Sequence, residues 1–116
     1  MKRSPITTHV LDTATGSPAS GVPVRLYYEE SPDKWMILAT GITNDDGRVG
    51  ELLPVDHSLK PGKYRMRFNT EEYFMANQVT GFYPYADVVF VITDTRPHYH
   101  IPLLLSPFGY STYRGS

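Results

Sequence analysis

The residues best suited to acid–base chemistry in this chain are histidines that share strand faces. His98 and His100 are one residue apart, so in a strand both side chains point to the same side. Near the start of the chain, the same alternation separates His9 from Val10. Because the unperturbed pKa of histidine is about 6.5, such residues can hold and deprotonate a water molecule near neutral pH.

Other interpretations of the histidines stay open at this point. His9, His98 and His100 could form a three-histidine zinc site with one open position. No carboxylate is obviously aimed at the rings to orient them, and we therefore expect no metal and no cofactor. A Ser-His-Asp arrangement is less favoured, because no Gly-x-Ser-x-Gly turn occurs. Each histidine could also be an ordinary exposed strand residue.

Arg48 and the end of the chain add polar groups to this set. Arg48 follows an Asn-Asp-Asp-Gly turn, and its guanidinium could hold a carbonyl edge or a developing oxyanion. Terminal residues usually fray, so an ordered Tyr113-Arg114-Gly115-Ser116 end would indicate a function. By alternation, Ser111 and Tyr113 share a strand face. The alternative is that Arg48 is a solvated edge charge and that the tail only packs or frays.

Short β-strands are the elements that must position these residues. Turn residues recur at 15–18, 31–33, 44–47, 60–62 and 106–109, at intervals that suit strands joined by tight turns. We predict strands over residues 6–12, 22–29, 35–42, 63–69, 88–93, 99–105 and 110–114. A short edge strand is predicted near residues 48–52. The simplest closure is an all-β sandwich of seven or eight strands.

Three segments carry further structural predictions. The predicted core side of the strand after His98 consists of Tyr99, Ile101, Leu103 and Leu105. Residues 88–92 are continuously apolar, which predicts a strand covered on both faces. Residues 70–77 depart from the strand pattern: Thr70 offers an N-cap and acidic residues follow it, which predicts one or two helical turns. An irregular connection is the alternative for that segment.

Composition narrows the class of protein. The 116 residues suit a single domain over 1–116. A formal net charge of −1 provides no basic field for nucleic acid. There is no cysteine, so neither disulfides nor thiolate metal sites hold the fold. No apolar run reaches the length of a signal peptide core or a membrane helix, which predicts a cytoplasmic protein without membrane contact.

Three segments resemble the 5-hydroxyisourate hydrolases, the transthyretin-related enzymes of urate degradation in purine metabolism. They are residues 8–24 (THVLDTATGSPASGVPV), 43–48 (TNDDGR) and 98–116 (HYHIPLLLSPFGYSTYRGS). The opening pattern is shared by many prealbumin-like sandwich modules. The Tyr-Arg-Gly-Ser ending is specific to the hydrolases.

The resemblance implies a prealbumin-like (transthyretin-like) sandwich that assembles as a homotetramer, a dimer of dimers with active sites where the dimers meet. It implies hydrolysis of a ring amide of 5-hydroxyisourate to 2-oxo-4-hydroxy-4-carboxy-5-ureidoimidazoline. Carried over by position, the catalytic residues are His9, Arg48 and His100. The implied substrate-binding residues are His98, Ser111, Tyr113, Arg114, Gly115 and Ser116.

Within that implied site, His9 and His100 hold and deprotonate the water, with the proton acceptor left open between them. Ser116 brings a hydroxyl and the terminal carboxylate. A transthyretin-type carrier would hold an aromatic ligand in the same channel without turnover, and a structural sandwich module would do neither. Transthyretin lacks the enzyme's histidine pair, arginine and tail, so the hydrolase is favoured.

Overall fold

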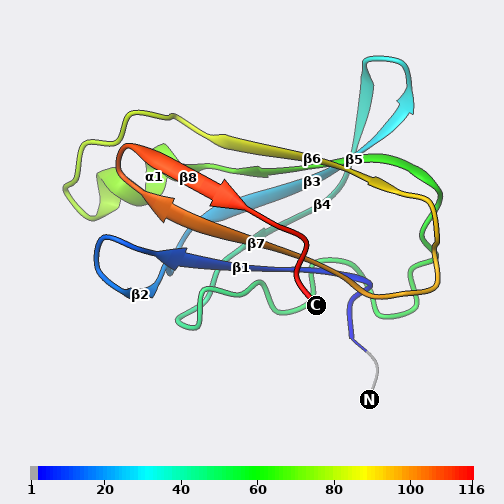
Figure 1. Cartoon of the computed structure of the whole chain (residues 1–116), viewed down its shortest axis with the longest axis horizontal. Coiled ribbons are helices and arrows are strands. Elements are labelled where there is room, and N and C mark those ends of the chain that lie inside the picture. Colours follow the sequence, from blue (N-terminus) through cyan, green and yellow to red (C-terminus); the bar gives the residue numbers. More distant parts are fainter. Residues whose placement is uncertain (1–2) are drawn as a thin grey trace.

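The computed structural model describes residues 3–116, which form two four-stranded sheets packed across one core (Figure 1). The first sheet has the order β2-β1-β7-β8, with β1 at Ile6–Asp12, β2 at Ser17–Pro18, β7 at Tyr99–Ser106 and β8 at Gly109–Thr112. The second has the order β4-β3-β5-β6, with β3 at Pro23–Ser31, β4 at Lys34–Ile42, β5 at Gly62–Phe68 and β6 at Ala86–Ile92. With the helix α1 at Thr70–Ala76, this confirms the predicted sandwich of seven or eight strands with one short helix, and the described residues form eight strands.

The parallel pairing of β1 with β7 joins the beginning of the chain to its end. The register places Thr7 opposite His100 and His9 opposite Pro102. Residues opposite each other in a parallel pair point to the same side of the sheet. Thr7, His9 and His100 therefore share the face that points away from the core, which we call the histidine face.

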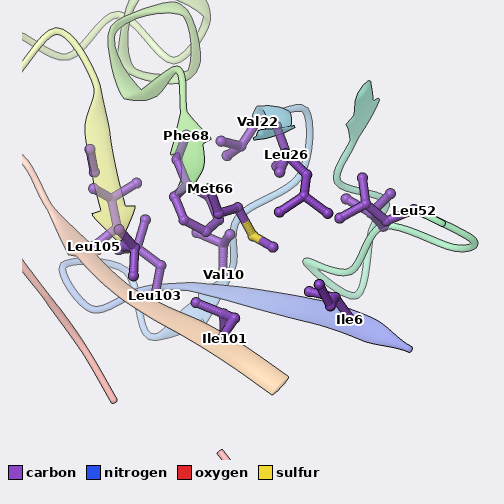
Figure 2. Close-up of a cluster of buried hydrophobic side chains, with 14 of the residues drawn as sticks. Ile6, Val10, Val22, Leu26, Leu52, Met66, Phe68, Ile101, Leu103 and Leu105 are labelled. Atoms are coloured by element: carbon purple, nitrogen blue, oxygen red, sulfur yellow. The ribbon is translucent and has the colours of Figure 1, made fainter. Parts of the chain in front are cut away.

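The opposite face of β1 and β7 packs into the core (Figure 2). The predicted core side of β7 is confirmed, because Tyr99, Ile101, Leu103 and Leu105 are all buried. Figure 2 shows these strands meeting side chains from β3 and β5, including Leu26, Met66 and Phe68. Full burial of an aliphatic or aromatic side chain contributes about 1.5–3 kcal/mol. This core holds the histidine face rigidly in place.

Two predictions about short segments are wrong. Residues 48–52 form no strand; the backbone makes only an isolated bridge between His9 and Arg48. The neighbours Leu52 and Leu53 are both buried, which the alternating side chains of a half-exposed strand do not allow. Ser17 and Pro18, predicted within a turn, instead pair with the end of β1 as β2.

The prediction that residues 88–92 are covered on both faces is also wrong for the single chain. Val88 and Ile92 are buried, whereas Val89 and Val91 are 54% and 59% exposed. A two-layer sandwich covers each sheet on one side only, and β6 also lies at a sheet edge. The apolar side chains on its outer face therefore have no cover within one chain.

The helical turns predicted after residue 69 are confirmed, but the predicted cap is wrong. Thr70 is the first helical residue, and its hydroxyl donates to the carbonyl of Tyr83 at 2.8 Å instead of capping. Asn69 occupies the N-cap position without a side-chain cap bond. Over the described residues, no helix has the length and apolar character that crossing a membrane requires.

Asp12 at the end of β1 ties the helix and the following turn to the sandwich. Its carboxylate is buried and accepts the Tyr73 hydroxyl at 2.7 Å. The other oxygen accepts the backbone amides of Ala14 and Thr15 at 3.0 and 3.2 Å. Burial, and then the bond to Asp12, raise the pKa of Tyr73 well above its usual range. The hydroxyl therefore stays protonated, and a donor, near neutral pH.

We expect Tyr73→Phe to lower the free energy of unfolding by roughly 1–3 kcal/mol, because it leaves a buried carboxylate oxygen without its partner. Urea denaturation measures the change. Tyr28→Phe is the matched control, since the Tyr28 hydroxyl donates to the Pro61 carbonyl at an exposed position. Equal losses in the two variants would contradict a special role for the buried bond.

Candidate active site

A cavity of about 380 Å³ lies on the histidine face. Its polar lining comprises Arg3, Thr7, Thr8, Asn44, Arg48, His98, His100 and Ser116. None of the described residues that line it is an aspartate or glutamate. The side chains of the cavity therefore offer imidazoles, hydroxyls, an amide and guanidinium groups, a set suited to an electron-rich heterocycle and to negative charge that develops during a reaction.

The turn before Arg48 holds this residue against β1. The Asn44 side-chain carbonyl accepts the amides of Asp46 and Arg48, at 2.9 and 3.1 Å, and the Gly47 carbonyl accepts the Val10 amide at 2.8 Å. Gly47 has a φ of 75°, and a side chain there would also collide with the Val10 carbonyl oxygen. Only glycine satisfies both conditions. The tight turn thus brings Arg48 beside the backbone of His9.

The end of the chain reaches the same place through Gly115. Its amide donates to the carbonyl of His100 at 2.9 Å. A Cβ atom on Gly115 would lie 2.6 Å from Cδ2 of the His100 ring, so any side chain would displace either the ring or the tail. The absence of a side chain allows Ser116 to line the cavity beside His100.

The remaining predicted residues are not all brought into this cavity. His9 lies beside it: its backbone bridges to Arg48 and its charge acts on His100, but its side chain is not part of the lining. Ser111 is exposed on β8, opposite Leu104. Tyr113 and Arg114 line a separate, mainly apolar groove, where the Arg114 guanidinium lies 4.8 Å from the centroid of the Tyr99 ring.

Thr7 is the site residue that sequence reasoning missed. Its hydroxyl oxygen lies 2.8 Å from Nε2 of His98 and 2.8 Å from Nδ1 of His100. A threonine two residues before a histidine carries no signal by itself. Only the pairing of β1 with β7 shows that Thr7 sits between the two rings. Asn44 and Arg3, which also line the cavity, were missed as well.

The surroundings of His100 favour its neutral form. Burial lowers the pKa of His100 most, and positive charge on Arg48, His98, His9 and Arg3 lowers it further. Burial followed by Arg3 likewise lowers the pKa of His98. Both imidazoles are therefore neutral near pH 7, the state in which a histidine can accept a proton.

The facing ring nitrogens of His98 and His100 are engaged by the Thr7 hydroxyl. Among residues 3–116, no group of three or more histidine, cysteine, aspartate or glutamate side chains is arranged to hold a metal ion. The arrangement suits acid–base chemistry on a bound water molecule.

We expect His100 to titrate below pH 6.5, and Arg48→Gln to raise its pKa. Removing a nearby positive charge makes the imidazolium form less costly, so the shift is upward. Histidine NMR spectra recorded across a pH series measure the pKa directly. Arg25→Gln, an exposed arginine on β3, is the control, and an unchanged His100 pKa in Arg48→Gln would contradict the electrostatic account.

The chain is similar to proteins of known function. A 5-hydroxyisourate hydrolase from Mus musculus is 52% identical over 114 residues, covering 97% of this chain and 96% of the relative. The crystal structure of a Klebsiella pneumoniae 5-hydroxyisourate hydrolase superposes with a TM-score of 0.82 at 36% identity, covering 96% of this chain and 97% of that one.

Transthyretins are also similar to this chain in structure. A sea bream transthyretin solved in complex with thyroxine superposes with a TM-score of 0.89 at 32% identity, covering 96% of this chain and 94% of that chain. The fold alone therefore does not distinguish an enzyme from a carrier protein. The residues that line the cavity must make that distinction. Residues 6–115 match the family described as HIUase/Transthyretin, and the chain belongs to that family.

Proposed function

We propose that this chain hydrolyses 5-hydroxyisourate at a ring amide, as one step of urate degradation, with His9, Arg48 and His100 as catalytic residues. The observation that carries the proposal is a single cavity in which His100, with a lowered pKa, lies beside Arg48. Relatives that are 52%, 47% and 43% identical to this chain are named 5-hydroxyisourate hydrolases. We also propose that residues 1–116 act as one transthyretin-like domain.

The proposed reaction begins with water held between His9 and His100. A neutral imidazole takes a proton from the water as its oxygen adds to the ring carbonyl. The carbonyl oxygen becomes an oxyanion, which the permanently charged guanidinium of Arg48 stabilises. The C–N bond of the ring then breaks, and the imidazolium returns its proton to the leaving nitrogen. The products of this bond cleavage are a carboxylate and a ureido group.

Substrate binding is assigned to the remaining polar groups. His98 and Ser116 line the same cavity as Arg48 and His100. Ser111 pairs with Leu104, whose side chain lies on the histidine face, so Ser111 is placed to contact whatever covers this face. Roles for Tyr113, Arg114 and Gly115 in substrate binding stay predictions, and so does the cytoplasmic location.

The direct test generates 5-hydroxyisourate from urate with urate oxidase and follows its ultraviolet absorbance after the purified chain is added. We expect acceleration over spontaneous decay, reduced roughly 10²–10⁴-fold in His9→Ala, Arg48→Ala and His100→Ala. The three residues lie outside the core, so circular dichroism should show an intact fold. His57→Ala, a histidine outside the cavity, is the matched control.

Two outcomes would contradict the proposal. Full activity in His100→Ala would remove that residue from the mechanism. A folded wild-type chain that leaves the spontaneous rate unchanged would favour the transthyretin-type carrier, the second candidate function, which the close fit to a thyroxine-bound transthyretin supports. Thyroxine binding would then be measured by calorimetry.

We further propose a homotetramer, a dimer of dimers with its active sites at the dimer–dimer interface. Strands β6 and β8 are both sheet edges, and they border the apolar groove that contains Tyr113. Unpaired strand edges beside apolar surface favour pairing with another chain. The exposed Val89 and Val91 on β6 fit such an interface.

Val91→Lys should therefore shift the assembly to smaller species in sedimentation velocity, because a charge at the β6 edge must be desolvated on pairing. Ile37→Lys is the matched control: Ile37 is 51% exposed on β4, at the opposite edge of the same sheet. An unchanged tetramer in Val91→Lys would rule out association through β6.

A further inference from the structure

The Thr7 hydroxyl connects the imidazole rings of His98 and His100. It lies 2.8 Å from a ring nitrogen of each of His98 and His100, on the partly buried histidine face. A hydroxyl carries one proton and two lone pairs, so it can donate to only one of the two rings. The direction of that donation decides which nitrogen of the other ring carries its proton.

The far side of His98 determines the direction. Its Nδ1 atom is buried and has no hydrogen-bond partner among the described residues. Burial and then Arg3 lower the pKa of His98, and the backbone of Ser4 partly opposes them, an effect that only an acceptor, the carbonyl, can have. Nδ1 makes no hydrogen bond there, but with a carbonyl close to the ring a proton on Nδ1 is far less costly than a buried lone pair.

A neutral His98 protonated on Nδ1 has an accepting Nε2, so Thr7 donates its proton there. The Thr7 oxygen then accepts from Nδ1 of His100, which must carry a proton. Because a neutral imidazole holds one proton, Nε2 of His100 is left with a lone pair. With Nδ1 engaged by Thr7, Nε2 is also the ring nitrogen left for the cavity.

We propose that Thr7 and His98 are positioning residues that hold His100 in the Nδ1-protonated tautomer, so that Nε2 of His100 is the atom that takes the proton from water. This inference rests on the proposed hydrolysis and assigns the proton acceptor within it. Free histidine favours the opposite tautomer, with the proton on Nε2, in which that atom cannot act as a base. The relay from Ser4 through His98 and Thr7 overcomes this preference.

The neutral state that the relay requires is present in the site. Burial lowers the pKa of His100 most, and positive charge on Arg48, His98, His9 and Arg3 lowers it further. A base with a lowered pKa remains unprotonated at neutral pH, and the relay selects which of its two nitrogens is used. Burial and the surrounding charges therefore keep His100 neutral, while the hydrogen bonds select the ring nitrogen that accepts the proton.

The test is ¹⁵N NMR of the histidine rings in the full chain without substrate, at a pH where His100 is neutral. We expect the Nδ1-protonated form of His100 in the wild type and the Nε2-protonated form in Thr7→Val, which keeps the branched shape but removes the hydroxyl. His98→Leu should produce the same change from the other end of the relay. Thr40→Val, an exposed position on β4, is the control for the substitution itself.

Kinetics supply the second readout. Thr7→Val should lower kcat roughly 10- to 100-fold with little change in KM, the usual size of a lost partner that orients a histidine. Thr7→Ser, which restores the hydroxyl, should recover most of kcat. If Thr7 had only a structural role, the recovery of kcat in Thr7→Ser would not be accompanied by a return of His100 to the Nδ1-protonated tautomer.

An Nε2-protonated His100 in the wild type, or an unchanged tautomer in both Thr7→Val and His98→Leu, would overturn the relay. These spectra need no turnover, so they separate this inference from the proposed function. A wild-type chain with the expected tautomers but no hydrolysis would support the relay and overturn only the hydrolase assignment.

Discussion

The parallel pairing of β1 with β7 is the constraint on which the site depends. It sets Thr7 opposite His100 across 93 positions of sequence, and it places the histidines on one face because the opposite face fills the core. A slip of one residue would turn that face inward and bury the imidazoles. The core residues of β7 therefore fix the register, and the register brings Thr7 and His100 together in the site.

Two glycines allow backbone to approach this pair closely enough to complete the site. Gly47 lets the turn before Arg48 bond to β1, and Gly115 lets the tail bond to His100. At each position a side chain would collide, with the Val10 carbonyl at the first and with the His100 ring at the second. Both glycines are needed because they lack a side chain. Their role is therefore recognised from the neighbouring atoms that a side chain would collide with.

The two wrong predictions about strands, for residues 88–92 and 48–52, have a common physical source. Alternation identified the core side of β7 correctly, because that strand packs on one face. It failed for Val89 and Val91, since a continuous apolar run does not distinguish cover by the same chain from cover by another. Around Arg48 it failed because the successive side chains of Leu52 and Leu53 both turn inward in irregular backbone.

The sequence by itself determined the sandwich, the short helix and the candidates His9, Arg48 and His100, because strand periodicity and residue chemistry are local properties. Only the tertiary structure decided that Thr7 lies between two imidazoles, that Gly115 must lack a side chain, and that Tyr113 and Arg114 face a different groove. These facts depend on which strands become neighbours and in what register. That information is distributed over the whole core, and no single segment contains it.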